Sequence, residues 1–164
     1  MQVIDNFLPP NKFKHIQSVL MGDRFPWFYN DHTCYPGDGL SYLSHVFVST
    51  ESPWNGEKST YYSLWDDCLE RMQCHQLYRI KSNLNLRTVF NRSSGWHYDF
   101  DDMTTAVLYM NTCNGYTKVK GHGKVKSVAN RLLRFSSNLQ HAGFTCTDEQ
   151  SRVVVNFNYK PLSL

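Results

Sequence analysis

The sequence of 164 residues is short enough to fold as one domain around one hydrophobic core. Hydrophobic residues make up 41% of the chain and charged residues 19%, which is typical of globular proteins and excludes an intrinsically disordered chain. The net charge of +3 comes from Lys and Arg residues that are scattered along the sequence. This argues against a nucleic-acid-binding protein, in which basic residues gather on one face.

Helical patterns occur in the first half of the chain. Between Pro10 and Gly22, apolar residues recur at helical spacing: Phe13, Ile16, Val19 and Leu20. A second helix is predicted behind Ser59 as its N-cap, on the apolar residues Tyr61, Leu64, Trp65, Cys68, Leu69 and Met72. Between the two helices, residues 40–50 alternate and are rich in β-branched and aromatic residues, which predicts a strand.

Short strands and turns follow from about residue 77 onward. Strands are predicted at about 80–90, 104–110, 116–119, 124–128, 131–135 and 152–159, with turn signals such as Asn114-Gly115 between them. Many short strands behind two helices predict a mainly β fold, a double-sheet jelly roll in which the helices buttress one sheet. We expect a single domain over residues 1–164, with helical support at about 1–76 and the β core at about 77–160.

The cysteines and the amino terminus indicate where the protein resides. The five cysteines form an odd set without a Cys-x-x-Cys pair, and reduced thiols in a cytoplasm are the simpler interpretation. The amino terminus has no basic stretch followed by an apolar run, and nowhere do about 18 apolar residues follow one another. We therefore expect a soluble cytoplasmic protein that does not associate with a membrane.

The segment from Trp96 to Phe100 carries the main candidate for a metal site. In an extended chain His97 and Asp99 point to the same face, while the residues between and before them point away. Iron(II) in oxygenases is typically held by two His and one carboxylate, which leaves three coordination positions open. His141 is the best candidate for the third ligand, because it follows one predicted strand and precedes the last one. Taken alone, His97 and Asp99 fit another interpretation better than a metal site: His97 is a hydrogen-bonded core or surface histidine, and Asp99 opens an acidic turn.

Arg152 lies in the last predicted strand, on the face that it shares with Val154, Asn156 and Asn158. The opposite face of this strand is apolar and predicts sheet core: Val153, Val155, Phe157 and Tyr159. An inward-facing Arg is costly without an anionic partner, and a dicarboxylate bound in two-pronged fashion by the guanidinium is one such partner. The alternative is an ordinary ion pair of Arg152 with the nearby Asp148 or Glu149.

The ordered set of motifs resembles the iron(II)- and 2-oxoglutarate-dependent dioxygenases, in particular short versions carried by marine bacteriophages and related to prolyl 4-hydroxylases. The matching stretches lie at residues 79–84, 96–100, 105–111, 114–119, 128–131, 137–141 and 145–159, and the opening residues 3–9 are similar as well. Many prolyl 4-hydroxylases have Gly-Gly where this chain has Gly115-Tyr116, and often Lys at the position of Arg152. The resemblance therefore implies a chemistry and leaves the substrate open.

The resemblance implies a double-stranded β-helix (cupin-like) fold, with iron(II) held by His97, Asp99 and His141. It also implies that Arg152 and Tyr109 bind the distal carboxylate of 2-oxoglutarate; we add Asn156, on the face of Arg152, as a further co-substrate residue. The implied reaction is hydroxylation of a C–H bond by O2, with release of succinate and CO2 and with ascorbate as a supporting reductant. If the chain is phage-encoded, the compartment is the cytoplasm of a bacterial host.

The substrate side of the pocket is predicted on the strand near residues 81–89, where Asn83, Asn85 and Arg87 share a polar face. A prolyl or other residue of a peptide or protein is the expected substrate, with a free metabolite as an alternative. An oxygenase acting on nucleic acid fits the dispersed charge poorly. A non-enzymatic jelly-roll module that binds a ligand or metal is the alternative from another class; three protein ligands argue against it, because a structural metal site usually has a fourth.

Overall fold

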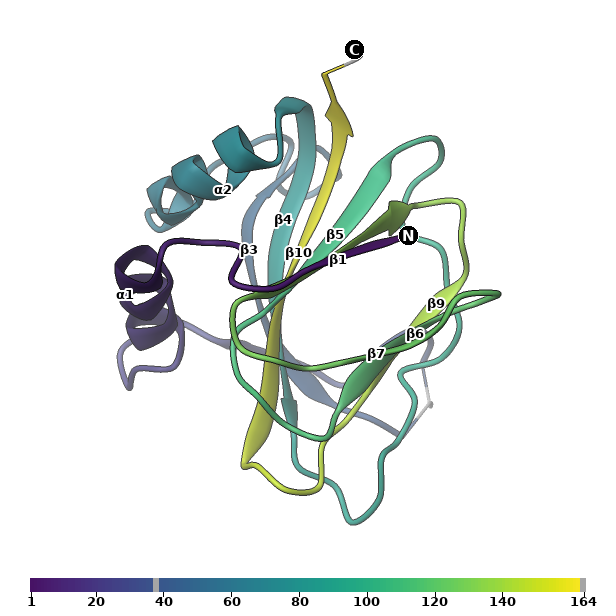
Figure 1. Ribbon diagram of the computed structural model, residues 1–164. Helices are drawn as coiled ribbons and strands as arrows, with labels where there is room; N and C mark the ends of the chain where they lie inside the picture. The colour runs from purple at the N-terminus through teal and green to yellow at the C-terminus, as the bar shows by residue number, and fades with distance from the viewer. Residues whose placement is uncertain (37–38, 163–164) are drawn as a thin grey trace.

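The computed structural model describes residues 1–36 and 39–162, and it places two antiparallel sheets face to face (Figure 1). The large sheet has seven strands in the order β1-β8-β5-β10-β4-β3-β2, and the small sheet has three in the order β7-β6-β9. The strands are β1 (Gln2–Ile4), β2 (Phe28–Asn30), β3 (Tyr42–Ser49), β4 (Cys74–Leu86), β5 (Thr104–Tyr109), β6 (Tyr116–Val119), β7 (Gly123–Lys126), β8 (Arg131–Ser136), β9 (His141–Phe144) and β10 (Ser151–Pro161).

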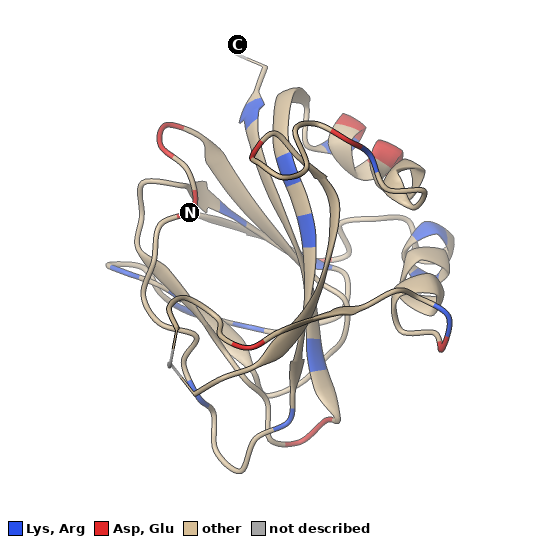
Figure 2. Cartoon of the chain, turned by 180° about the vertical axis from the view of Figure 1, so that it is seen from behind, with Lys and Arg blue, Asp and Glu red and all other residues tan. Residues whose placement is uncertain are grey.

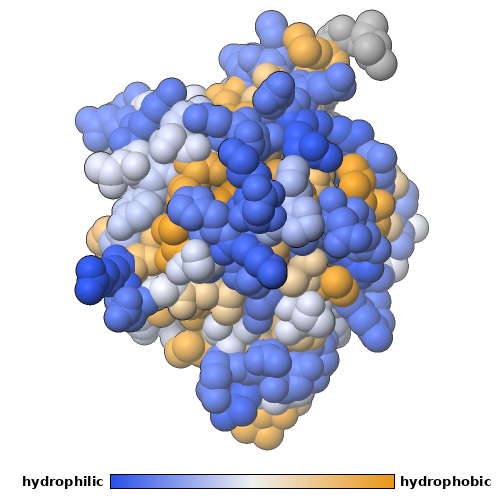
Figure 3. Space-filling view, turned by 60° about the vertical axis from the view of Figure 1, so that its left-hand side comes forward, coloured by the Kyte–Doolittle hydropathy of each residue, from blue (hydrophilic) through white to orange (hydrophobic). Residues whose placement is uncertain are grey.

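Two helices, α1 (Pro10–Leu20) and α2 (Asp66–Arg71), lie on the side of the large sheet away from the small sheet (Figure 1). The predicted class, a mainly β jelly roll with helices buttressing one sheet, is therefore confirmed. Neither of these helices is both long and apolar enough to cross a membrane. The helical side presents a mostly hydrophilic surface with dispersed apolar residues (Figure 3).

The second helix begins differently from the prediction. A 3-10 turn, η1 (Tyr62–Trp65), precedes α2, and Ser59 is not its N-cap. Instead, the Ser59 hydroxyl accepts a hydrogen bond from the backbone N–H of Tyr61 at 3.2 Å, which fixes the turn before the helix. The tighter turn buries Trp65 completely, edge-on against Phe47 and Phe157.

Three short strands were missed by the sequence patterns, and one long strand is shifted. The strands β1, β2 and β9 have only three or four residues each, too few for an alternation of apolar and polar residues to stand out. The strand predicted at about 80–90 runs from Cys74 to Leu86, because β10 pairs with it as far as Pro161↔Cys74. Side chains beyond Leu86 therefore do not follow the alternation of this strand.

The side chains of β10 alternate between two layers. One face packs in the apolar layer between the large sheet and the helices, and the other face, which carries Arg152, Val154 and Asn156, is turned toward the small sheet. Val153, Val155, Phe157 and Tyr159 are buried in the cluster that joins the large sheet to the helices, as predicted. The opposite face of β10 lines the cavity between the two sheets. Figure 2 shows that positively charged residues recur along the long strands of the large sheet. The polar face of β10 is thus available to form a site.

The small sheet covers only part of the large one. Its apolar contacts form a second cluster, in which Val119 and Val125 pack on residues of β5, β8 and β10. Among the described residues, this cluster contains none from β3 or β4. The inner faces of β3 and β4 therefore lie outside the apolar contact between the two sheets.

His45 gives the fold a pH dependence of its own. This buried residue of β3 bonds the Pro26 carbonyl through Nδ1 at 2.9 Å and the Ser59 hydroxyl through Nε2 at 2.7 Å, and burial lowers its pKa although the bond to Pro26 opposes the shift. A histidine with a lowered pKa in the folded state stabilises the fold fully above the unfolded pKa of about 6.5, and this contribution is lost as the pH falls below it. We expect the free energy of unfolding to fall between pH 7.5 and pH 5, as measured by urea denaturation.

The variant His45→Gln is expected to be less stable at pH 7.5 and to lose less stability on acidification than the wild type. Burial shifts the pKa of His141 in the same direction, so that part of the slope remains in the variant. Equal slopes for variant and wild type would contradict the role of His45.

Candidate functional site

A cavity of about 310 Å³ lies between the two sheets. The strand β4 contributes four side chains of one face, Arg79, Lys81, Asn83 and Asn85, and β10 contributes Arg152, Val154 and Asn156. The small sheet closes the far side with residues of β6 and β9, and the segment 94–99 crosses one end. The alternation of two neighbouring strands thus lines one cavity with polar and cationic groups.

The structure brings His97, Asp99 and His141 together at this end of the cavity. One potential ligand atom of each lies within 4.8 Å of those of the other two, and the distance from His141 Nε2 to Asp99 Oδ2 is 3.6 Å. The backbones of the two histidines exchange both N–H to carbonyl hydrogen bonds at 3.0 Å, which fixes their relative position. Two histidines and a carboxylate on one side of a cavity match the ligand set of a mononuclear iron(II) site.

The local structure around these residues differs in part from the prediction. His97 and Asp99 lie outside the strands, and within the described residues the segment 96–100 is paired by the bridge His97↔His141. His141 follows β8 and precedes β10, as predicted, and it begins the short strand β9. Trp96 and Tyr98 are exposed at 48% and 56%, but Tyr98 also lines the cavity and so does not point fully away from it.

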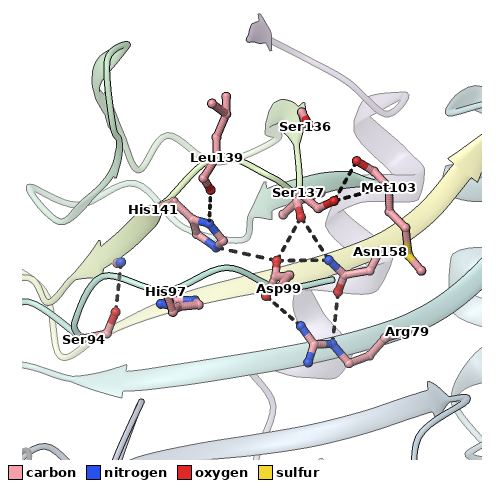
Figure 4. A network of polar contacts seen from close by, with 12 residues as sticks. Arg79, Ser94, His97, Asp99, Met103, Ser136, Ser137, Leu139, His141 and Asn158 are labelled. Atoms are coloured by element: carbon pink, nitrogen blue, oxygen red, sulfur yellow. Dashed lines mark hydrogen bonds and ion pairs between the residues drawn. The ribbon is translucent and has the colours of Figure 1, made fainter. Parts of the chain in front are cut away.

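Asp99 is held by three donors, and Figure 4 shows two of them, Arg79 and Asn158, directed at its carboxylate. Arg79 Nη2 donates to Oδ1 at 2.9 Å, and Oδ2 accepts from Thr105 Oγ1 at 2.9 Å and Asn158 Nδ2 at 3.0 Å. Burial alone would raise the pKa of Asp99, but Arg79 and the two histidines hold it below its usual value. Asp99 is therefore a carboxylate in a fixed orientation, ready to bind a cation.

No role for Arg79 or Thr105 was predicted from the sequence. Arg79 could have been found, because it shares the alternating face of Asn83 and Asn85 in the same strand. Its partner Asp99 is twenty positions away in a loop, so only the folded chain identifies the pair.

Both histidines have one ring nitrogen occupied and the other free for a metal. Nδ1 of His97 lies 3.1 Å from the Gly95 carbonyl and 3.4 Å from Cys34 Sγ, and Nδ1 of His141 lies 3.3 Å from the Leu139 carbonyl. A carbonyl partner keeps the proton on Nδ1 and leaves Nε2 as a lone-pair donor. Burial lowers the pKa of His141, although Asp99 raises it, so that this ring stays neutral as a metal ligand requires.

Arg152 is buried beside the same cavity without a carboxylate. It is 2% exposed, and Nη2 donates to Thr117 Oγ1 at 2.9 Å, whereas its buried Nε has no partner. Within residues 1–36 and 39–162 it forms no ion pair, and the alternative partner Asp148 instead accepts hydrogen bonds from the backbone N–H of Asn114. Burial lowers the pKa of Arg152. Such a cation requires an anion from outside the chain.

Tyr109 contributes a second unmatched group next to Arg152. Its ring centre lies 5.5 Å from the guanidinium carbon, and its buried hydroxyl forms no hydrogen bond of ordinary geometry. Burial raises the pKa of Tyr109, although Arg152 opposes the shift, so the hydroxyl keeps its proton and can donate it to an acceptor. Arg152, Thr117 and Tyr109 form a pocket of donors suited to a carboxylate.

Of the three residues predicted to bind the substrate, two line the cavity and one does not. Asn83 and Asn85 line the cavity, and so does Asn156. Arg87 is exposed and lies after the end of β4, and it is not among the residues that line the cavity. Its predicted place was wrong, because the strand ends at Leu86 and the alternation ends with it.

Gly115 provides the space for Arg152. A Cβ at this position would lie 2.6 Å from Arg152 Cδ and 3.0 Å from the Phe144 carbonyl oxygen. We expect Gly115→Ala to lower the free energy of unfolding by about 1–3 kcal/mol, the usual cost of overpacking, in urea denaturation. The matched control is Gly143→Ala, whose Cβ would meet Arg152 and Ser94 only at 3.5 Å and should change stability little. Equal effects of both variants would contradict this explanation.

Comparisons with solved structures show which fold this is. No protein-family model matches the sequence, and no curated protein sequence matches it. A 2OG-Fe(II) oxygenase family oxidoreductase from Burkholderia pseudomallei is similar in structure with a TM-score of 0.73 at 13% identity, over 96% of this chain and 84% of that one. HygX from Streptomyces hygroscopicus, solved with nickel and 2-oxoglutarate bound, gives 0.59 at 13% identity over 98% and 82%.

A prolyl hydroxylase from Trichoplax adhaerens, in complex with a peptide fragment of the hypoxia inducible factor oxygen degradation domain, gives a TM-score of 0.58. Its identity is 14%, over 97% of this chain and 83% of that one. At these identities the likenesses establish a shared fold. The chain thus has the double-stranded β-helix architecture of 2-oxoglutarate oxygenases, and its function has to be argued from its own site.

Proposed function

We propose that this protein is an iron(II)- and 2-oxoglutarate-dependent oxygenase that hydroxylates a C–H bond and releases succinate and CO2. The observation that carries the proposal is the buried, unpaired guanidinium of Arg152 beside the cavity that contains His97, Asp99 and His141. A binding module for a metal alone needs no buried cation facing the metal's cavity. A dianion that binds iron at one end and Arg152 at the other accounts for both the metal-ligand set and the buried guanidinium.

In this proposal His97, Asp99 and His141 hold iron(II) through three protein ligands. Bound iron and 2-oxoglutarate supply the activation of O2, while the protein supplies placement and electrostatics. Arg79 and Thr105 fix the carboxylate of Asp99, so that it meets the metal in one orientation. The carbonyl partners of both Nδ1 atoms fix the imidazoles in the same way.

The distal carboxylate of 2-oxoglutarate is assigned to Arg152, Thr117 and Tyr109. Arg152 offers an unpaired Nε, and Tyr109 a buried hydroxyl without an acceptor. Asn156 lies four positions further along the same face of β10 and lines the same cavity, so we assign it as a further co-substrate residue. The low-dielectric surroundings of Arg152 strengthen its attraction for a carboxylate.

A residue of a peptide or protein is the proposed substrate. The support is the fold shared with a prolyl hydroxylase that was solved with a peptide fragment. Within the described residues, four of the five cysteines form no disulfide: Cys68, Cys74, Cys113 and Cys146. This is consistent with the reducing cytoplasm that we propose as the compartment. A free metabolite and a nucleic acid are the competing substrates.

An anaerobic titration of the purified protein with iron(II) and 2-oxoglutarate tests the proposal. We expect a weak visible charge-transfer band that saturates at one equivalent of iron and needs both components. In air, with ascorbate, the protein should release succinate slowly even without a substrate. If iron binds and the band does not form, the protein is a metal-binding module and the oxygenase proposal is wrong.

A further inference from the structure

The apolar contact of the small sheet is with β5, β8 and β10, so the cavity walls formed by β3 and β4 lie outside that contact. Arg152 contacts Thr117 of β6 and therefore lies under the small sheet. The side chains of Lys81 and Tyr42 line the cavity from β4 and β3. His97, Asp99 and His141 line the same cavity, so a substrate bound beside the metal site shares the cavity with Lys81 and Tyr42.

Lys81 is the second cation of the cavity without an anionic partner. Its Nζ donates to the Tyr42 hydroxyl at 2.8 Å and lies 5.2 Å from the centre of the same ring. No carboxylate forms an ion pair with it in the part of the chain that the structure describes. The Tyr42 contact holds the ammonium against the wall and leaves two of its three N–H groups for a ligand.

Other polar groups around Lys81 are also unmatched. The buried Oδ1 of Asn83, two positions along the strand, has no hydrogen-bond partner. The Tyr42 hydroxyl accepts from Lys81, so its own proton can be donated to a further acceptor. The wall of β3 and β4 thus offers an ammonium and a hydroxyl to a ligand, with an amide beside them.

The charges of the cavity leave room for one anion besides 2-oxoglutarate. Arg79 is matched by Asp99 at 2.9 Å and by Glu51 at 4.0 Å. The divalent iron and the dianion 2-oxoglutarate carry equal and opposite charges. Glu51 does not line the cavity, so the positive charges there exceed the negative ones by those of Arg152 and Lys81. Half-buried cations of this kind gain most from a directly bound anion.

We propose that the substrate of the oxygenase carries a carboxylate, and that Lys81 and Tyr42 bind it beside the metal site. This inference rests on the proposed function and specifies its substrate class. The carboxylate belongs to a free amino acid or to the end or an acidic side chain of a peptide. A single ammonium with a hydroxyl suits one carboxylate, whereas a phosphate would call for more positive charge.

The first experiment compares acids with their amides on the wild-type protein loaded with iron(II) and 2-oxoglutarate. One panel contains the twenty L-amino acids and their primary amides, and a second contains peptides with free or amidated ends and with Asp or Asn and Glu or Gln pairs. Succinate release above the rate without substrate is measured, and products are examined for an added oxygen by mass spectrometry. We expect at least one carboxylate to stimulate the release, and its amide to fail. The panel that contains it identifies the source.

The second experiment measures KM for that carboxylate in variants of Lys81. Loss of one charge-assisted contact in Lys81→Met should raise this KM by about 10- to 100-fold, and Lys81→Arg should restore part of the affinity. The KM for 2-oxoglutarate should change by less than about threefold, because Arg152 binds that molecule. The matched control is Lys126→Met, on the exposed face of β7, which should change neither constant.

Three results would overturn the inference. The first is a wild-type protein that forms the iron and 2-oxoglutarate band but responds to no carboxylate; this leaves the proposed function intact. The second is stimulation by amides and acids alike. The third is a Lys81→Met variant whose KM rises for 2-oxoglutarate instead of for the stimulating acid, which would assign Lys81 to the co-substrate. Loss of the band itself in the wild type would instead contradict the proposed function.

Discussion

Replacing His141 by alanine is expected to abolish the visible band and to reduce succinate release by more than about 100-fold, since loss of groups that merely orient metal ligands already costs 10- to 100-fold. The ring of His141 is buried, and its Nε2 lies 3.6 Å from Asp99 Oδ2, so the substitution removes one of the three proposed ligands. Iron(II) affinity is measured anaerobically with a competing chelator, and succinate by mass spectrometry.

The control for His141 is His122→Ala, because His122 is exposed in the turn between β6 and β7 and contributes nothing to the cavity. A folded state of the His141 variant is checked by circular dichroism, since its ring also packs on Phe135 at 4.9 Å between ring centres. The variant His141→Gln keeps more of this packing and should fail in the same way. Full turnover in a folded His141→Ala protein would exclude the proposed metal site.

Replacing Arg152 by methionine is expected to raise the KM for 2-oxoglutarate by more than about 30-fold, since truncating one partner of a buried charge pair costs about 2–5 kcal/mol. Without 2-oxoglutarate, the same variant should be at least as stable as the wild type in thermal unfolding. The reason is that Arg152 is buried with Nε unpaired and burial lowers its pKa, so removing it relieves a desolvation penalty.

The two readouts together distinguish an anion site from a structural ion pair. If Arg152 were paired within the protein, Arg152→Met would strand its partner and lower the melting temperature. Arg87→Met is the matched control, because Arg87 is exposed beyond the end of β4 and should affect neither stability nor KM. A destabilised Arg152 variant with an unchanged KM for 2-oxoglutarate would refute the assignment.

Short-range spacing along the chain predicts which side chains can share a face. The spacing of His97 and Asp99 indicated a common side, and the alternation of β10 separated the apolar core residues from Arg152 and Asn156. These features depend on chain geometry over a few residues, which is why they are readable without a structure. The jelly roll itself followed from the number and length of the strands.

Which of these faces meet follows from the folded arrangement of the strands. The pair of Arg79 and Asp99, the bridge between His97 and His141, and the lack of a carboxylate at Arg152 all depend on the register between strands that are distant in sequence. Register is set by the packing of the whole sheet, and the end of β4 at Leu86 removed Arg87 from the site for the same reason. Local patterns carry no information on such long-range contacts, and the chemistry of this cavity is made of them.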